Sequence, residues 1–392
     1  DLVAQYGEFQ TMLASEKDYV ATRVANRLNL NGPALSIHTA CSTGLVAVTQ
    51  AWHALASGQC DVALAGGTSV VVPQESGYLH VEGGMESADG HCRPFDANAS
   101  GTVFASGGGV VVLKRLEDAS RDGYTIYGVI RGVGVNNDGG DKASFTAPSV
   151  SGQAAAIRMA LDHAQINARS IGYVEAHGTG TALGDPIEVA ALTRAWRDDT
   201  ADEQFCGLGS VKSNLGHMVA AAGVVGLVKA TLALHREVIP ATLHFQHPNP
   251  QIDFSHSPFH VISKKTAWTR CDQPRYAAVS SFGVGGTNAH VIVQEGTASQ
   301  IEPVESGDRL WMLPLSAATG EAVLRRARDL ADHLEEHPKL PLAPVVATLM
   351  RGRRALNHRA SVTAKTTGEA VVALRALKST TQITKNPRIV FL

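Results

Sequence analysis

The sequence contains few cysteines and no close pair of them. Its 5 cysteines are scattered over 392 residues, include no Cys-x-x-Cys pair and are odd in number. Structural zinc sites and disulfide frameworks both need clustered or paired cysteines. We therefore expect neither kind of cross-link and no metal, and free thiols indicate a reducing, cytoplasmic compartment.

The chain also has little net charge, and we find in it no apolar run long enough to span a bilayer. Its 34 Lys and Arg residues nearly balance its 36 Asp and Glu residues, which gives a formal net charge of −2. Nucleic-acid-binding domains usually carry a basic excess, and a membrane-spanning helix needs about 20 mostly apolar residues. We therefore expect neither a nucleic-acid partner nor a membrane protein.

Cys41 lies where an extended apolar run turns into a helical pattern. Residues 34–37 predict a short strand before it, and the helical pattern after it ends at Gly58. That pattern is carried by Leu45, Val48, Trp52 and Leu55. A thiol at the start of a helix meets unpaired backbone N–H groups, which favour the thiolate and can hold a developing oxyanion. The position suits a nucleophile, although a free cysteine is as often a small buried hydrophobe.

Two histidines follow apolar runs of strand type. Residues 171–174 precede His177, and residues 207–211 precede the turn that leads to His217. Both histidines are therefore predicted to lie at the carboxyl ends of strands, where open α/β sheets bind their ligands. One histidine among 16 is more often structural than catalytic. Two in matching contexts, together with Cys41, indicate a site.

Four motifs resemble the ketosynthase domain of type I polyketide synthases. They are TACSTG at 39–44, EAHGTGTALGDPIE at 175–188, KSNLGH at 212–217 and SSFGVGGTNAH at 280–290. Their order and spacing fit the family over about residues 1–294. The resemblance implies an α/β fold with thiolase-like, duplicated βαβ layers. It also implies polyketide chain elongation, in which a malonyl-type extender condenses with an acyl thioester in a decarboxylative Claisen reaction.

The resemblance assigns the chemical roles to four positions. Cys41 would carry the growing acyl chain, and the backbone N–H groups of Cys41 and Val284 would form the oxyanion hole. His177 and His217 would donate hydrogen bonds to the enolate oxygen that forms when the extender loses carbon dioxide. The sequence leaves open whether either histidine also acts as a base.

Four further residues receive roles by the same resemblance, and Lys212 is counted with the catalytic residues. Lys212 would join a hydrogen-bond network with Glu175 beneath the site, whereas without the motif the two would be read as an exposed pair. Thr179 and Thr181 would bind phosphopantetheine, although threonines also stabilise turns. No cofactor is expected to be tightly bound, because the phosphopantetheine arm belongs to an acyl carrier protein. A homodimer and a neighbouring acyltransferase domain in the same polypeptide are implied as further partners.

Composition changes near residue 296, which predicts three parts. Residues 1–296 form the ketosynthase domain, whose first strand-helix half is expected to be incomplete because Cys41 stands so early in the chain. We expect such a fragment to aggregate or to be inactive by itself. Residues 297–386 resemble the adaptor between ketosynthase and acyltransferase. Strands at 310–315 and 360–362 and helices at 324–334 and 370–374 predict that it is a small α/β domain. Residues 387–392 resemble the first strand of an acyltransferase.

Other interpretations remain open to different degrees. A degradative thiolase needs a second cysteine near the last glycine motif, where this chain has Asn288 and His290. A chalcone-synthase-like enzyme pairs its cysteine with one histidine and an asparagine. A fatty-acid synthase ketosynthase performs the same chemistry and stays an alternative. So does a dimerisation scaffold that has lost condensation.

Overall fold

The computed structural model describes residues 2–74, 76–140, 142–296 and 309–383. The chain divides into two compact units, residues 1–299 and 300–392. The predicted domain boundary follows residue 296, the last described residue before 309, and the predicted acyltransferase strand at 387–392 lies outside the described residues. Each unit is therefore considered by itself.

A six-stranded sheet forms the centre of the first unit. Its strand order is β3-β10-β9-β4-β5-β7, with antiparallel pairing from β3 to β9 and parallel pairing from β9 to β7. The strands span Gly128–Asn137 (β3), Ile171–Glu175 (β4), Cys206–Gly209 (β5), Phe259–Val261 (β7), Tyr276–Phe282 (β9) and Thr287–Glu295 (β10). The strands predicted before the two histidines are therefore confirmed as β4 and β5, and they are direct neighbours.

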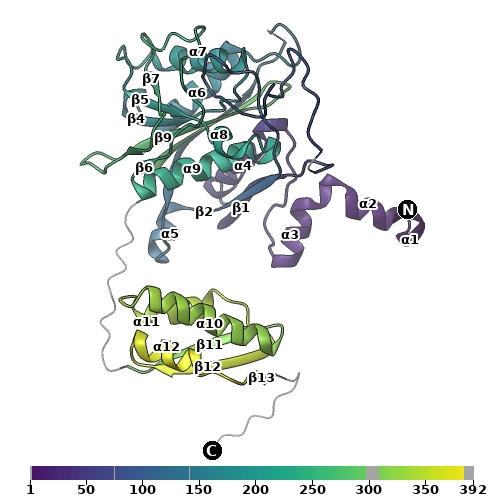
Figure 1. Cartoon of the computed structure of the whole chain (residues 1–392), viewed down its shortest axis with the longest axis vertical. Helices are drawn as coiled ribbons and strands as arrows, with labels where there is room; N and C mark the ends of the chain where they lie inside the picture. The colour runs from purple at the N-terminus through teal and green to yellow at the C-terminus, as the bar shows by residue number, and fades with distance from the viewer. Residues whose placement is uncertain (1, 75, 141, 297–308, 384–392) are drawn as a thin grey trace, which may run out of the picture. The chain divides into compact units, whose positions relative to one another are not determined.

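Helices cover both faces of this sheet (Figure 1). On one face α6 (Val150–Ala164) packs on β3 and β10 and against α7 (Gly184–Trp196). On the other face α9 (Ala222–Arg236) packs on β9 and β4, beside α4 (Thr43–Ala56). Beyond α4 and α9 lies an antiparallel pair of strands, β1 (Val62–Ser69) and β2 (Gly107–Lys114). The expected layered α/β fold is confirmed.

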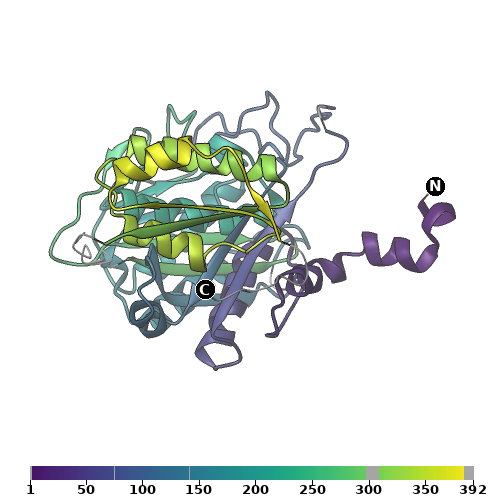
Figure 2. The same cartoon turned by 90° about the horizontal axis from the view of Figure 1, so that it is seen from below.

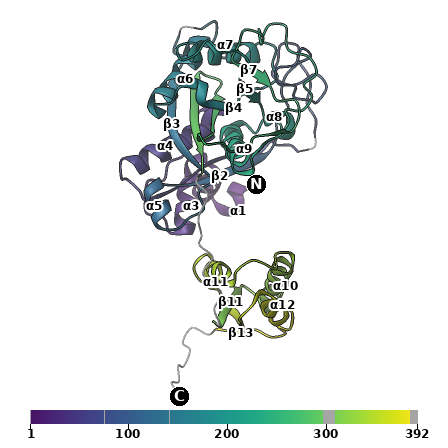
Figure 3. The ribbon, with the colours of Figure 1, turned by 90° about the vertical axis from the view of Figure 1, so that its left-hand side faces the viewer.

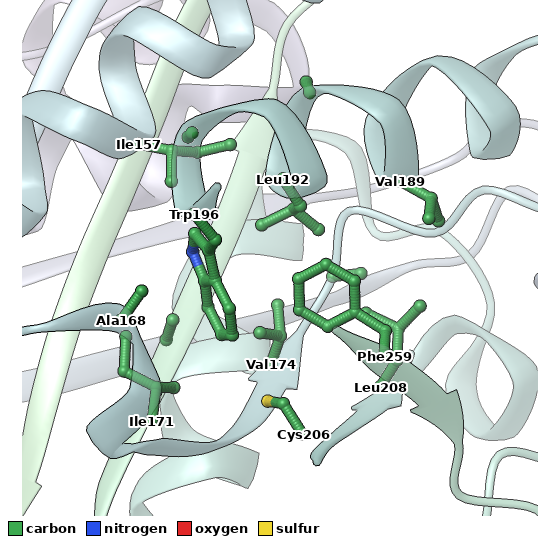
Figure 4. Packing of buried hydrophobic residues seen from close by; sticks show 14 of the residues in the cluster. Ile157, Ala168, Ile171, Val174, Val189, Leu192, Trp196, Cys206, Leu208 and Phe259 are labelled. Atoms are coloured by element: carbon green, nitrogen blue, oxygen red, sulfur yellow. The ribbon is translucent and has the colours of Figure 1, made fainter. Parts of the chain in front are cut away.

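An aromatic cluster holds α6 and α7 on the sheet (Figure 4). Trp196, at the end of α7, is fully buried and its ring centre lies 4.7 Å from that of Phe259 on β7. Ile157 of α6 and Val174 of β4 belong to the same cluster. Burying side chains of this size stabilises the fold by about 2 kcal/mol each. The packing also fixes α7 relative to β4, which matters because the first turn of α7 supports the site.

The helix α9 corrects one expectation from the sequence. The 18 residues Val219–Arg236 form a segment that is long and apolar enough to cross a membrane by length and composition. Half of that segment is buried within the chain, where Val224, Leu227 and Leu234 pack between the two sheets. Its apolar composition is therefore explained by its place in the core.

The first helices of the chain bury none of their side chains. They are α1 (Leu2–Tyr6), α2 (Glu8–Ser15), the 3₁₀ turn η1 (Lys17–Tyr19) and α3 (Val20–Leu28). Figure 2 shows them extending away from the sheets of the first unit. The strand predicted at 34–37 is wrong, because residues 33–39 belong to no helix or strand. Extended backbone becomes a strand only beside a hydrogen-bonding neighbour, and this segment has none among the described residues.

Short elements complete the first unit. They are η2 (Ala40–Ser42), α5 (Leu116–Arg121), η3 (Ala168–Ser170), α8 (Lys212–Leu215), η4 (Val219–Ala221), β6 (Val238–Ile239) and β8 (Thr266–Ala267).

The second unit is a small sheet between helices (Figure 3). Its strands are β11 (Trp311–Ala317), β12 (His358–Ala364) and β13 (Thr381–Gln382), and its helices are α10 (Gly320–Glu336), α11 (Leu342–Arg351) and α12 (Thr367–Arg375). The helix α11 lies on one face of the sheet, and α10 and α12 lie together on the other. The four predicted elements of this domain are confirmed as β11, α10, β12 and α12, whereas α11 and β13 were not predicted.

Candidate active site

Three reactive side chains that are far apart in the sequence meet in the first unit. One ligand atom each of Cys41, His177 and His217 lies within 4.8 Å of the other two. The rings of the two histidines are 5.5 Å apart and nearly perpendicular, at 85°. One small ligand placed between them would therefore contact all three groups.

Neighbouring strands bring these groups together. His177 follows β4 and His217 follows β5 and α8, while β9 runs parallel to β4 on its other side. The carboxyl ends of these three strands consequently meet at one edge of the sheet. Ser281, near the end of β9, donates a hydrogen bond of 2.9 Å to the carbonyl of Cys41. This bond ties the start of α4 to the same edge.

Cys41 sits in the tight turn η2 that leads into α4. The residue before it, Ala40, has a φ of 51°, which is in the left-handed region that alanine rarely adopts. The Ser42 hydroxyl donates to the carbonyl of Thr39 at 2.8 Å and closes the turn. Cys41 itself is only 4% exposed. The backbone is therefore held in a strained form that presents the thiol at the helix start.

Burial and hydrogen bonding act on the Cys41 thiol in opposite directions. Burial raises its pKa above the usual value, and hydrogen bonding from the backbone of Val284, the charge of Lys212 and the backbone N–H of Cys41 itself oppose that rise. The two amides predicted to form an oxyanion hole thus both act on this sulfur. A carbonyl carbon bonded to the sulfur would place its oxygen near the same two N–H groups.

Both histidines are neutral donors in this environment. Burial, together with the charge of Lys212 and the neighbouring ring of His217, lowers the pKa of His177 well below the usual value. Burial, with a smaller effect of Lys212, lowers the pKa of His217 to about 3. The backbone N–H of Val219 donates to Nδ1 of His217 at 3.1 Å. The ring proton of His217 is therefore on Nε2, a buried atom with no hydrogen-bond partner among the described residues.

The same hydrogen bond argues against a metal at this site. A cysteine and two histidines at this spacing resemble a zinc ligand set. However, a metal ligand nitrogen needs a free lone pair, whereas Nε2 of His217 carries the proton as long as Nδ1 accepts from Val219. The residues therefore fit a ligand that accepts hydrogen bonds better than they fit a cation.

Two carboxylates of α7 hold the loop that carries His177. Glu188 accepts the backbone N–H groups of His177 and Gly178, each at 2.7 Å. Asp185 accepts the backbone N–H groups of Phe95 at 2.7 Å and Gly180 at 3.1 Å. Burial raises the pKa of Glu188 to about 7 and that of Asp185 to about 6.

The sequence analysis did not assign roles to these two carboxylates. Their spacing, three residues apart near the start of a helix, was the available signal.

The predicted partnership of Lys212 with Glu175 is wrong in its geometry. The ammonium of Lys212 donates a hydrogen bond to the carbonyl of His177. The ion pair of Glu175 is instead with Lys229 of α9, with Nζ and Oε2 2.8 Å apart. Burial lowers the pKa of Lys212, and the charges of Glu175 and Glu188 oppose that effect from a distance. Lys229 reaches Glu175 directly because α9 lies across the end of β4.

Thr179 and Thr181 lie in the loop after His177. Their hydroxyl oxygens are 3.0 Å apart, and Thr181 also accepts the backbone N–H of Gly184 at 3.1 Å. Thr179 is 6% exposed. Both hydroxyls therefore support the turn and stand beside the catalytic candidates.

Comparison with known families gives three adjacent matches. Residues 4–119 match the N-terminal domain of beta-ketoacyl synthase, residues 127–246 match its C-terminal domain, and residues 248–362 match the ketoacyl-synthetase C-terminal extension. The two synthase matches together cover more than half of the chain.

Named relatives are polyketide synthases. The chain is 46% identical over 352 residues to a phenolphthiocerol/phthiocerol polyketide synthase of Mycobacterium tuberculosis, which covers 89% of the chain and 24% of that protein. It is 44% identical over 357 residues to erythronolide synthase EryA3 of Saccharopolyspora erythraea, covering 91% of the chain and 11% of that protein. The chain thus spans less than a quarter of the length of these large proteins.

Solved structures agree with these matches. Ketosynthase twelve of the bacillaene polyketide synthase of Bacillus amyloliquefaciens superposes with a TM-score of 0.87 at 37% identity, covering 95% of the chain and 65% of that structure. The ketosynthase from module 6 of the bacillaene synthase of Bacillus subtilis superposes with a TM-score of 0.84 at 38% identity, covering 96% of the chain and 66% of that structure. The chain therefore belongs to the beta-ketoacyl synthase family, with a thiolase-like fold, and matches ketosynthase domains of modular type I polyketide synthases over most of its length.

Proposed function

We propose that this chain supplies the condensing site of a polyketide synthase, which elongates an acyl chain by decarboxylative Claisen condensation. The observation that carries the proposal is the meeting of the Cys41 thiol with two neutral imidazoles within 4.8 Å. One nucleophile and two uncharged N–H donors match the needs of a reaction that passes an acyl group to sulfur and then develops charge on a thioester oxygen.

In the first half-reaction the Cys41 thiolate attacks the carbonyl carbon of an acyl thioester. The carbonyl oxygen becomes an oxyanion, which the backbone N–H groups of Cys41 and Val284 stabilise. The carbon–sulfur bond to the donor then breaks, and the donor leaves as a thiolate that takes a proton from water. The acyl group remains on Cys41.

In the second half-reaction a malonyl-type thioester loses carbon dioxide. The electron pair of the broken carbon–carbon bond moves into an enolate, whose oxygen accepts hydrogen bonds from His177 and His217. The enolate carbon attacks the acyl carbonyl on Cys41 and forms the new carbon–carbon bond. The Cys41 thiolate leaves, so the site returns to its starting state. Lys212, bonded to the carbonyl of His177, holds that loop in place.

We assign the delivery of both thioesters to the phosphopantetheine arm of an acyl carrier protein. Thr179 and Thr181 are the proposed contacts for the arm, because their hydroxyls lie in the loop that follows His177. The proposal includes a homodimer in the cytoplasm. It assigns residues 1–296 to the ketosynthase, 297–386 to the adaptor and 387–392 to an acyltransferase domain in the same polypeptide.

Two variants of a polypeptide that contains this chain test the assignment of roles. Cys41→Ala abolishes transfer of an acyl group from an acyl N-acetylcysteamine thioester but leaves decarboxylation of malonyl carrier protein, because both histidines remain. His217→Ala impairs decarboxylation more than acylation of Cys41. Mass spectrometry of the acyl-enzyme and release of labelled carbon dioxide measure the two half-reactions separately.

The outcomes distinguish the alternatives. Chain elongation by the Cys41→Ala variant refutes the nucleophile. Loss of the acyl-enzyme in His217→Ala with normal decarboxylation refutes the enolate role. A parent protein that is never acylated by any thioester donor indicates a scaffold that has lost condensation. Analysis of the product separates a polyketide from a fatty acid.

A further inference from the structure

A buried ion pair lies beneath the site and takes no part in the reaction described above. Nζ of Lys229 on α9 is 2.8 Å from Oε2 of Glu175 at the end of β4, and the two side chains are 9% and 2% exposed. The hydroxyl of Tyr173 donates to the same carboxylate oxygen at 2.6 Å. Burial and the charge of Glu175 raise the pKa of Tyr173 well above its usual value, so this hydroxyl stays a donor.

The other oxygen of Glu175 reaches the second catalytic segment. Oε1 accepts the backbone N–H of Val211 at 2.6 Å. Val211 directly precedes Lys212 and the helix α8, which leads to His217. Glu175 itself stands two residues before His177. One carboxylate thus joins the backbone of β4, just before the first histidine, to the segment that carries the second.

The structure leaves room for this carboxylate against α9. A Cβ added to Gly226 would lie 3.1 Å from Cγ of Glu175, so glycine at this position lets the side chain lie close to the helix. Lys229 follows three residues later on the same helix face. The ammonium of Lys212 is bonded to the carbonyl of His177, which leaves Lys229 as the ion-pair partner of Glu175 in the described parts of the chain.

We propose that Lys229 is a positioning residue for condensation, which acts through Glu175 to hold His177 and the Lys212–His217 segment in register for the enolate. This inference rests on the proposed function and adds Lys229 to the residues that support the reaction. Its physical basis is that a buried carboxylate keeps its charge and its hydrogen bonds only beside a counter-charge. Cys41 is tied to β9 through Ser281, so the thiol is not part of this network.

A charge-compensation series tests the proposal in a polypeptide that contains this chain. Lys229→Met removes the positive charge beside Glu175. Glu175→Gln removes the negative charge beside Lys229. The double variant Glu175→Gln/Lys229→Met removes both charges and keeps an oxygen at position 175 for the N–H of Val211. Lys229→Arg is the conservative variant. Lys265→Met is the matched control, since it makes the same chemical change at an exposed lysine.

We expect each single variant to lose at least tenfold in decarboxylation of malonyl carrier protein, with acylation of Cys41 reduced no more than threefold. The double variant and Lys229→Arg recover decarboxylation to within about fivefold of the parent protein, and Lys265→Met is unchanged. Recovery in the double variant indicates a charge pair, because the effects of two independent losses of packing would add.

Two results overturn the proposal. One is decarboxylation by Lys229→Met at the rate of the parent protein, and the other is a double variant that is as impaired as the worse single variant. Failure of the proposed function is recognised separately, because the parent protein then shows neither acylation nor decarboxylation. If Lys229→Met does not fold, the comparison of Glu175→Gln with Glu175→Gln/Lys229→Met still decides, since circular dichroism and thermal unfolding identify the folded variants.

Discussion

Gly283 lies where the turn that carries Val284 approaches the segment before Cys41. A Cβ added at Gly283 would lie 2.3 Å from the carbonyl oxygen of Thr39 and 2.9 Å from the hydroxyl of Ser42. The first of these contacts is with backbone, which cannot rotate away. Gly283→Ala therefore forces the turn away from the nucleophile, although alanine itself tolerates the backbone angles at this position.

The size of the effect follows from this distance. Carbon and oxygen atoms that are not bonded seldom approach closer than about 3.2 Å, so the two segments must separate by about 1 Å. The N–H of Val284 moves with the turn and loses its alignment with an oxyanion on Cys41. Loss of one such donor costs about 3 kcal/mol of transition-state stabilisation, which is roughly 100-fold in rate. We expect a decrease of this size in acylation of Cys41.

Acylation by an acyl N-acetylcysteamine thioester, followed by mass spectrometry of the intact protein, measures this rate. Decarboxylation of the extender should fall less, because hydrogen bonds from outside this turn hold the two histidines: Glu188 accepts the backbone N–H of His177, and Val219 donates to the ring of His217. Gly140→Ala is the matched control, since a Cβ at Gly140 has no heavy atom within 4 Å. Acylation by Gly283→Ala within threefold of the parent protein, with both variants folded, would refute the reasoning about the oxyanion hole.

Two further predictions concern ionisation and association. Burial raises the pKa of the Cys41 thiol above 9.0, so the rate of its alkylation by iodoacetamide should still increase with pH near that value. Lys212→Met should shift this pH profile to higher pH, because it removes a charge that favours the thiolate. A rate that is already constant below pH 8 would contradict the raised pKa. The face of β1 and β2 exposes Val110 by 65% and Val112 by 68%, so we expect the chain to sediment as species larger than a dimer. Replacing both valines by threonine reduces these species and Val372→Thr on α12 does not, whereas a parent chain that never exceeds a dimer refutes this expectation.

Much of the fold was predictable because its strands and helices have strong local patterns. The apolar runs before His177 and His217 became β4 and β5, and the helical pattern after Cys41 became α4. One exception is the segment at 34–37, whose pattern suits a strand but whose backbone has no strand beside it among the described residues. Whether an extended segment becomes a strand depends on a neighbouring strand that can form hydrogen bonds with it, and the local sequence pattern does not show whether such a strand is present.

The site was predictable as a set of residues but only partly as a set of contacts. Motifs identified Cys41, His177, His217 and Lys212, and their spatial meeting follows from strands that end at one edge. The counter-charge of Glu175 was assigned to the wrong lysine. Lys229 lies 54 residues further along the chain, in a helix whose apolar composition hides the charge. Ion pairs between residues far apart in the chain depend on the angle and position at which a helix packs on a sheet, and these cannot be read from a single sequence.

Burial of the two histidines has a chemical consequence that ties the fold to the proposed reaction. An imidazolium is a stronger hydrogen-bond donor than an imidazole, but it also gives up its proton readily. Beside an enolate carbanion it would protonate the carbon and end the reaction before the new bond forms. A neutral imidazole stabilises the same oxygen without surrendering its proton. Burial lowers the pKa of His217 to about 3, so that ring is neutral near pH 7. In the proposed reaction, burial of the two histidines therefore favours condensation over simple protonation of the extender.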